Sequence, residues 1–235
     1  MPGGEPMRLV GSTLFVGKQH KYLPARRLLR FTGTTHRSVH ASGPTSAVCV
    51  GIGHQLGGDF VAAIAVFREV VNIDRWLNRD SEDVATDLNT LAGAEYAAGD
   101  LDAAERDFRE ALRIARLLNY RQVISSSTGN LAGLALVRGN WTGAEALASE
   151  ALAMAQGVGK RESIALNSHR LASALVRQGK KSEALPHANR AVGILTRLGS
   201  PSLARARATL AECESEQKDF EPQGLSPSTL PSPDS

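Results

Sequence analysis

The sequence lacks proline through most of its length. Of the ten prolines, none lies between Pro44 and Pro186, which leaves 141 residues without one. Because proline breaks the interior of a helix, this absence favours helical structure over that stretch. Alanine, the strongest helix former, is correspondingly concentrated there, with 31 of 33 alanines in residues 47–220.

Cysteine pairs and long apolar runs are also missing. The two cysteines, Cys49 and Cys213, lie far apart in the sequence, which excludes a disulfide framework and a zinc site built from paired thiols. The apolar runs are too short for a transmembrane helix. The early apolar stretch 9–16 is short and interrupted by Gly11, so no secretory signal is predicted. We therefore expect a cytoplasmic, reducing compartment and no membrane partner.

Charge divides the chain into regions of opposite sign. The first 46 residues hold seven Lys or Arg against one acid, Glu5, whereas the remaining residues hold 20 basic and 23 acidic side chains. We expect residues 1–46 to form a basic, poorly ordered N-terminal extension and residues 47–220 to form the folded domain. Residues 221–235 contain four prolines among serines, which predicts a disordered tail.

An internal repeat of about forty residues runs through the folded domain. Its clearest marker is a glycine that recurs at spacings of 41, 40 and 40, at Gly58, Gly99, Gly139 and Gly179. Alanine follows each glycine by five residues, and further apolar residues follow by nine, twelve and thirteen. These offsets mark one face of a helix. A leucine lies eight residues before three of the glycines, at Leu91, Leu131 and Leu171.

Each repeat is therefore predicted to be a helical hairpin, with helix A, a glycine turn and helix B. Glycine at the end of helix A can adopt the left-handed conformation that terminates a helix. The expected N-caps of helix B are Asp102, Thr142 and Ser182, and Glu105 and Glu145 would complete two capping boxes.

The second repeat resembles the tetratricopeptide repeat (TPR) pattern through Gly99, Leu101, Ala104, Phe108 and Ala111, in the family's order. The resemblance covers residues 47–220. It implies an all-α, right-handed TPR-like solenoid of helical hairpins, with about four repeats plus a C-terminal capping helix near 203–217. The forty-residue period is similar to the TPR arms of bacterial NB-ARC-type regulators.

The resemblance also implies a function and a site. In the family, helix A lines a concave groove that holds a peptide, so we expect a module that binds a partner protein or peptide, as a scaffold or sensor arm in bacterial signalling or transcription regulation. Asparagine can pair with a peptide backbone and arginine with a carboxylate, although a solvated face is the alternative interpretation of the same residues. The expected groove residues are Thr86, Asn89, Thr90, Tyr96, Ser126, Asn130, His169, Arg170, Arg177 and Arg205.

Few patterns in the sequence indicate chemistry. The stretch 48–57 resembles a strand followed by a dinucleotide loop, but that site needs a strand–helix–strand unit, and the sequence downstream has the helical period throughout. The six histidines show no metal-ligand spacing, and no nucleophile has a visible base. The predictions are therefore no enzyme activity, no cofactor and no metal.

A basic segment near the N-terminus supports a second interpretation. Residues 18–31 combine Lys and Arg with the aromatic residues Tyr22 and Phe31, a pattern that suits nucleic acid or another acidic partner. The alternative function is thus a regulator that contacts nucleic acid through residues 1–46. Deletion of that segment distinguishes the two, because a groove binder keeps its partner and a nucleic-acid binder loses it.

Overall fold

Nine helices and one β-hairpin make up the part of the chain that the structure, a computed structural model, describes: residues 7–10, 13–16 and 44–215. The hairpin pairs β1 (Met7–Val10) with β2 (Thr13–Val16) in antiparallel register. The predicted tail 221–235 and most of the predicted extension 1–46 lie outside the described residues. The helices are α3 (Pro44–Leu56), α4 (Phe60–Leu77), α5 (Glu82–Ala98), α6 (Leu101–Leu117), α7 (Arg121–Val137), α8 (Trp141–Val158), α9 (Arg161–Arg177), α10 (Lys181–Leu198) and α11 (Leu203–Glu214).

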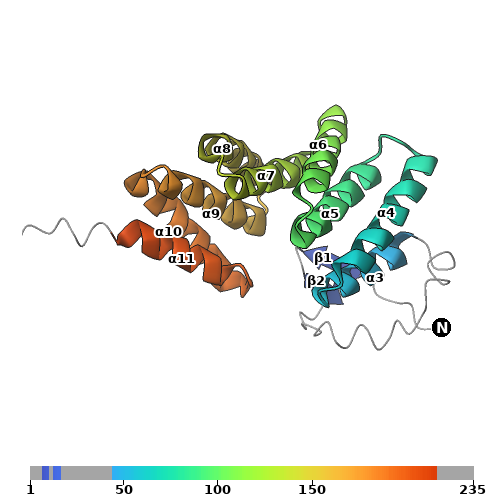
Figure 1. The fold of residues 1–235 in the computed structure, drawn as a ribbon, viewed down its shortest axis with the longest axis horizontal. Helices are drawn as coiled ribbons and strands as arrows, with labels where there is room; N and C mark the ends of the chain where they lie inside the picture. Colours follow the sequence, from blue (N-terminus) through green and yellow to red (C-terminus); the bar gives the residue numbers. More distant parts are fainter. Residues whose placement is uncertain (1–6, 11–12, 17–43, 216–235) are drawn as a thin grey trace, which may run out of the picture.

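The helices form a solenoid of antiparallel hairpins, as the repeat predicts (Figure 1). Helices α3, α5, α7, α9 and α11 are the A helices, and α4, α6, α8 and α10 are the B helices. Every helix packs against the next one along the chain. In addition, α5 packs on α7, α7 on α9 and α9 on α11, whereas no comparable packing joins successive B helices within 44–215. The A helices are therefore on the inner side of the curved stack, and the B helices are on the outer side.

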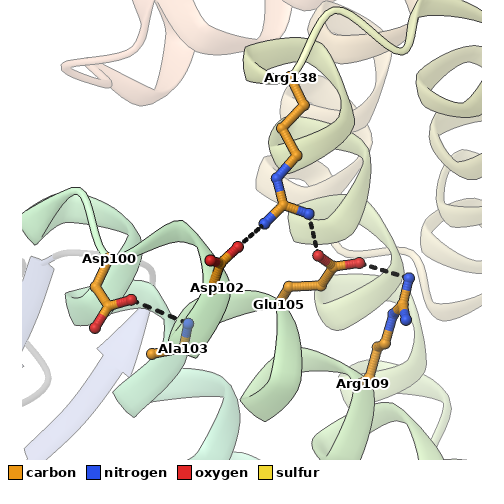
Figure 2. A network of polar contacts seen from close by, with 6 residues as sticks. All are labelled: Asp100, Asp102, Ala103, Glu105, Arg109 and Arg138. Carbon is orange, nitrogen blue, oxygen red and sulfur yellow. Dashed lines mark hydrogen bonds and ion pairs between the residues drawn. The ribbon is translucent and has the colours of Figure 1, made fainter.

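The turns inside the hairpins begin with glycine in the left-handed region, at φ 89° for Gly99 and 74° for Gly139. Helix B then starts at once. Asp100 accepts a hydrogen bond from the Ala103 amide at 3.1 Å (Figure 2), and Asn140 caps α8 in the same way. The prediction of caps two residues later, at Asp102, Thr142 and Ser182, was wrong, because the residue directly after the glycine already has the N-cap geometry.

The glutamates predicted to complete capping boxes instead connect neighbouring repeats. Arg138, just after α7, forms ion pairs with Asp102 and Glu105 on α6, and Glu105 also pairs with Arg109 (Figure 2). Forty residues later, Glu145 on α8 accepts hydrogen bonds from Gln178 at 2.7 Å and from Lys180 at 2.9 Å. The same repeat position thus provides the acidic partner in both pairs of repeats.

The core consists of small residues facing large ones. Ala104 and Ala144 are fully buried, and Phe67 and Phe108 fill the space between helices. The glycine-rich start of the domain is explained in the same way. A Cβ atom on Gly51 would lie 2.5 Å from the Phe67 ring, so glycine lets α3 approach α4 closely. Because residues 48–56 belong to this packed helix, the structure excludes the dinucleotide-loop interpretation.

Candidate functional site

All ten residues predicted for the groove lie on A helices. We call the surface formed by α5, α7, α9 and α11 the groove. Asn130 and Arg170 occupy equivalent repeat positions, forty residues apart on α7 and α9. By helix, the predicted residues are Thr86, Asn89, Thr90 and Tyr96 on α5, Ser126 and Asn130 on α7, His169, Arg170 and Arg177 on α9, and Arg205 on α11.

A chain of hydrogen bonds crosses three of these helices. Asn89 Oδ1 accepts from Ser127 Oγ at 3.0 Å and from Asn130 Nδ2 at 3.3 Å. Arg170 donates to Asn130 Oδ1 at 2.8 Å through Nη2 and to Asn167 Oδ1 at 2.9 Å through Nη1. We call these five residues the polar row. Since they satisfy one another, they hold α5, α7 and α9 in register and are less available to a ligand than the sequence alone suggests.

Arg170 lies against a notch in α7 made by glycine. A Cβ atom on Gly129 would overlap Asn167 Oδ1 and come within 2.9 Å of Arg170 Nη1, and one on Gly133 would lie 3.5 Å from Arg170 Nε. Asn167 itself is 1% exposed. The absence of a side chain at Gly129 therefore allows the Asn167–Arg170 pair to lie directly on α7.

The α9 end of the groove holds three arginines, Arg170, Arg177 and Arg205, and among the described residues only Arg177 has a carboxylate partner, Glu212 at 3.9 Å. Arg170 is half-buried and bonds only to neutral amides, and no carboxylate of the described residues pairs with it or with Arg205. Burial, with a smaller contribution from the charge of Arg205, lowers the pKa of Arg170 to about 10. Burial, Arg205 and Arg170 together lower the pKa of His169 to about 4, so this imidazole is neutral at pH 7. The Nδ1 atom of His169 is buried and has no hydrogen-bond partner in the structure.

Charge along the solenoid follows the same direction. Residues 47–120 hold seven Lys or Arg and thirteen Asp or Glu, whereas residues 121–215 hold twelve Lys or Arg and six Asp or Glu. The first half of the solenoid is therefore acidic and the second half basic.

Of the remaining predicted residues, Tyr96 is half-buried and packs against the hydrophobic core, and the others divide into two groups. The hydroxyls of Thr86, Thr90 and Ser126 donate to backbone carbonyls of their own helices, and Thr86 is exposed. Arg177 and Arg205 are exposed and weakly held. Arg177 Nη2 lies 3.9 Å from a Glu212 oxygen, and Arg205 donates to Ser202 at 3.4 Å. A ligand can therefore contact these two guanidinium groups without breaking a strong interaction within the protein.

A shallow hollow of about 370 Å³ opens beside Arg177. Its walls come from the end of α7, the start of α8 and the second half of α9. Leu136, Val137 and Trp141 supply an apolar surface, and Ser173 and Arg177 supply a polar rim. We call this feature the hollow. It joins an apolar surface to a cation, which suits an apolar group attached to an anionic one.

Sequence reasoning missed Ser127, Asn167 and Trp141. A signal for the first two was available, because Asp87, Ser127 and Asn167 occupy the same repeat position at spacings of forty and are polar in all three repeats. Trp141 follows a turn on a B helix, where the repeat pattern predicts no ligand contact. Its contribution becomes visible only when the start of α8 is placed beside α9.

Two further properties concern the described residues only. None of their helices combines the length and apolar character needed to cross a membrane. No group of three or more His, Cys, Asp or Glu side chains there is arranged to hold a metal ion. The basic segment 18–31, on which the nucleic-acid alternative depends, lies outside these residues.

Comparison with solved structures finds the same fold in proteins of low identity. BtubC (BKLC) from P. vanneervenii is 19% identical with a TM-score of 0.64, covering 83% of this chain and 81% of that one. A Rap protein complexed with competence and sporulation factor is 14% identical with a TM-score of 0.69, covering 83% and 54%. A signal transduction ATPase with numerous domains (STAND) and a TPR sensor, from Pyrococcus horikoshii, is 18% identical with a TM-score of 0.63, covering 84% and 29%.

Sequence comparison gives the family directly. Among curated proteins no sequence matches this chain significantly. The tetratricopeptide repeat family, however, matches residues 44–116 and 123–197, more than half of the chain. These two segments contain α3–α6 and most of α7–α10, the four hairpins of the solenoid. On this match and this architecture, the chain belongs to the tetratricopeptide repeat family.

Proposed function

We propose that this protein binds a partner protein or peptide in its groove and acts as a scaffold or sensor arm in bacterial-type signalling or transcription regulation. TPR domains are protein-interaction modules, and this chain has the architecture of one. The observation that carries the proposal is the groove itself. It is lined by polar side chains on four A helices, and its exposed arginines have no strong partner within the described residues.

The similar structures support the two parts of the proposal. The Rap protein is complexed with a factor, and the STAND protein uses its TPR region as a sensor. This chain spans only about a third of the STAND protein and about half of the Rap protein. A role as the sensor arm of a larger signalling system is therefore the corresponding proposal for this chain.

The test is capture of a partner from the source cell's lysate with the full chain. The groove variant changes Thr86, Arg177 and Arg205 to alanine, because these exposed residues lie on the A helices and outside the polar row. The matched control changes exposed residues of the same types on the B helices, namely Thr142, Arg106 and Arg197. Equal circular dichroism spectra show that all three proteins fold.

A partner held by the parent and the control and lost by the groove variant supports the proposal. A partner lost only by the control places the interaction on the B helices and contradicts the groove. A partner that is lost when residues 1–46 are deleted, and is kept by both triple variants, favours the nucleic-acid alternative or another contact of the basic segment.

A further inference from the structure

The second half of the groove has an anionic ligand as its electrostatic complement. Arg170 is half-buried, and within the described residues both of its hydrogen bonds go to neutral amides. Arg205 contacts a hydroxyl, and Arg177 is 3.9 Å from the exposed Glu212 carboxylate. A guanidinium group that is removed from water loses the hydrogen bonds of its hydration shell. Where the protein supplies no carboxylate, an anionic ligand is the best replacement for them. The same end of the solenoid has twice as many Lys and Arg as Asp and Glu.

The hollow lies at the same end of the solenoid, so a ligand that fills it also needs an apolar group. Arg170 and Arg177 are seven residues apart on α9, which places them on one face about 10 Å apart along the helix axis. Arg177 also forms the rim of the hollow, whose walls are Leu136, Val137 and Trp141. Its volume, about 370 Å³, falls within the range of roughly 300–1,000 Å³ that small ligand sites occupy. An apolar side chain in the hollow therefore puts its neighbouring residues beside Arg177.

We propose that the ligand of the groove is an acidic peptide segment with one apolar anchor residue. The anchor, aliphatic or aromatic, enters the hollow between α7, α8 and α9. A carboxylate next to the anchor pairs with Arg177, and acidic residues further along the peptide face Arg170 and Arg205. This inference rests on the proposed function and specifies the ligand that the groove selects.

The polar row fixes the position of the Arg170 guanidinium before a ligand binds. Asn130 and Asn167 fix two faces of the Arg170 guanidinium, and the Gly129 notch leaves no side chain between it and α7. A carboxylate that reaches Arg170 therefore meets a cation whose rotamer entropy has already been lost on folding. Such preorganisation strengthens binding without requiring further contacts.

The test uses fluorescence anisotropy of the full chain with a short fluorescein-labelled peptide of Asp and Glu with one central Phe. Three peptides of the same length serve for comparison. One replaces the acids by Asn and Gln, one replaces them by Lys, and one replaces the Phe by Ala. The protein variants are R177Q/R205Q and the matched pair R197Q/R207Q, which removes the same charge from exposed positions outside the groove.

We expect the acidic Phe peptide to bind and the other three to bind at least several-fold more weakly. Because a hydrogen bond to a charged group contributes about 1.5–3 kcal/mol, R177Q/R205Q should lower the affinity roughly tenfold or more. R197Q/R207Q should change it by less than about twofold, since exposed charges at a distance are screened by salt.

Three results would overturn the inference. One is equal loss of affinity in both double variants, which would mean general charge attraction. Another is binding of the acidic peptide that does not depend on Phe. The third is a preference for the neutral or the basic peptide that is lost on Thr86→Ala. That last result would contradict the proposal of an acidic ligand, but it would still support peptide binding in the groove and thus the proposed function.

Discussion

Gly129 is the residue whose substitution tests the polar row most sharply. A methyl group at this position would overlap Asn167 Oδ1 and lie 2.9 Å from Arg170 Nη1. Because Asn167 is 1% exposed, its side chain has no free space into which it can turn. Gly129→Ala is therefore expected to break the hydrogen bond between Arg170 and Asn167. The matched control is Gly93→Ala on α5, where a Cβ atom meets nothing within 4 Å.

Both substitutions increase helix propensity, and only Gly129→Ala also loses a hydrogen bond. Replacing glycine by alanine inside a helix stabilises by about 1 kcal/mol. Gly93→Ala keeps that gain, which corresponds to a rise in Tm of roughly 2–4 °C for a domain of this size. Gly129→Ala also loses a hydrogen bond to a charged group, worth about 1.5–3 kcal/mol. Its net effect is a destabilisation of about 0.5–2 kcal/mol, so the variants should differ by about 1.5–3 kcal/mol.

The assay is urea unfolding followed by circular dichroism, with thermal melts alongside. A third variant, Asn167→Ala, removes the group that Gly129→Ala displaces. In the double variant the added methyl group no longer overlaps Asn167, and only its contact with the end of the flexible Arg170 side chain remains. The two losses should therefore not add, and the interaction energy should be about 1 kcal/mol or more. If Gly129→Ala is as stable as Gly93→Ala, or if the two substitutions are additive, the polar row does not hold α7 and α9 as described.

The remaining predictions concern the core, a buried carboxyl group and the ion pairs between repeats. Ala104→Leu should destabilise the folded domain by roughly 1–3 kcal/mol through overpacking. Ala97→Leu, at an exposed site, should not. An unchanged Tm for Ala104→Leu would refute the helical register. Burial raises the pKa of Asp87 to about 8, helped by hydrogen bonding with another carboxyl. The contribution of this group to stability is full below its ordinary pKa and falls as pH rises from there through about 8. Asp87→Asn should therefore flatten the decline in urea midpoint between about pH 4 and pH 8, and an unaltered profile would contradict it. Arg138→Ala should lower the free energy of unfolding by less than about 1 kcal/mol, and by less still in high salt, because Arg138 is 36% exposed and its partner Asp102 is 94% exposed. A larger cost that does not depend on salt would mean that the ion pairs of Arg138 are structural.

The architecture was predictable because it repeats. One glycine per repeat, followed five residues later by alanine, predicted the number of hairpins and the faces that pack. Helix starts were less accurate. At Asp102 and Thr142 the pattern of capping residues suggested a start two positions late, since both Asp100 and Asp102 suit an N-cap by type. The structure distinguishes them by the left-handed Gly99, directly after which Asp100 takes the capping geometry.

The residues predicted for the groove all lie on A helices, but their hydrogen-bond partners could not be found from the repeat alone. Asn89 and Asn130 are 41 residues apart, so they occupy adjacent rather than equivalent positions, and their hydrogen bond runs diagonally between α5 and α7. The position of Arg170 depends on Gly129, a residue on another helix that contributes only empty space. Diagonal contacts and small residues of this kind become visible once the helices are stacked.

The central claim is that the inner surface of the A helices binds the partner. Hydrogen exchange of the full chain, with and without the partner recovered by capture, tests it most directly. The prediction is slower exchange on binding across α5, α7, α9 and α11, centred on α9, with little change in α4, α6, α8 and α10. Protection confined to the B helices or to residues 1–43, with the A helices unchanged, would contradict it.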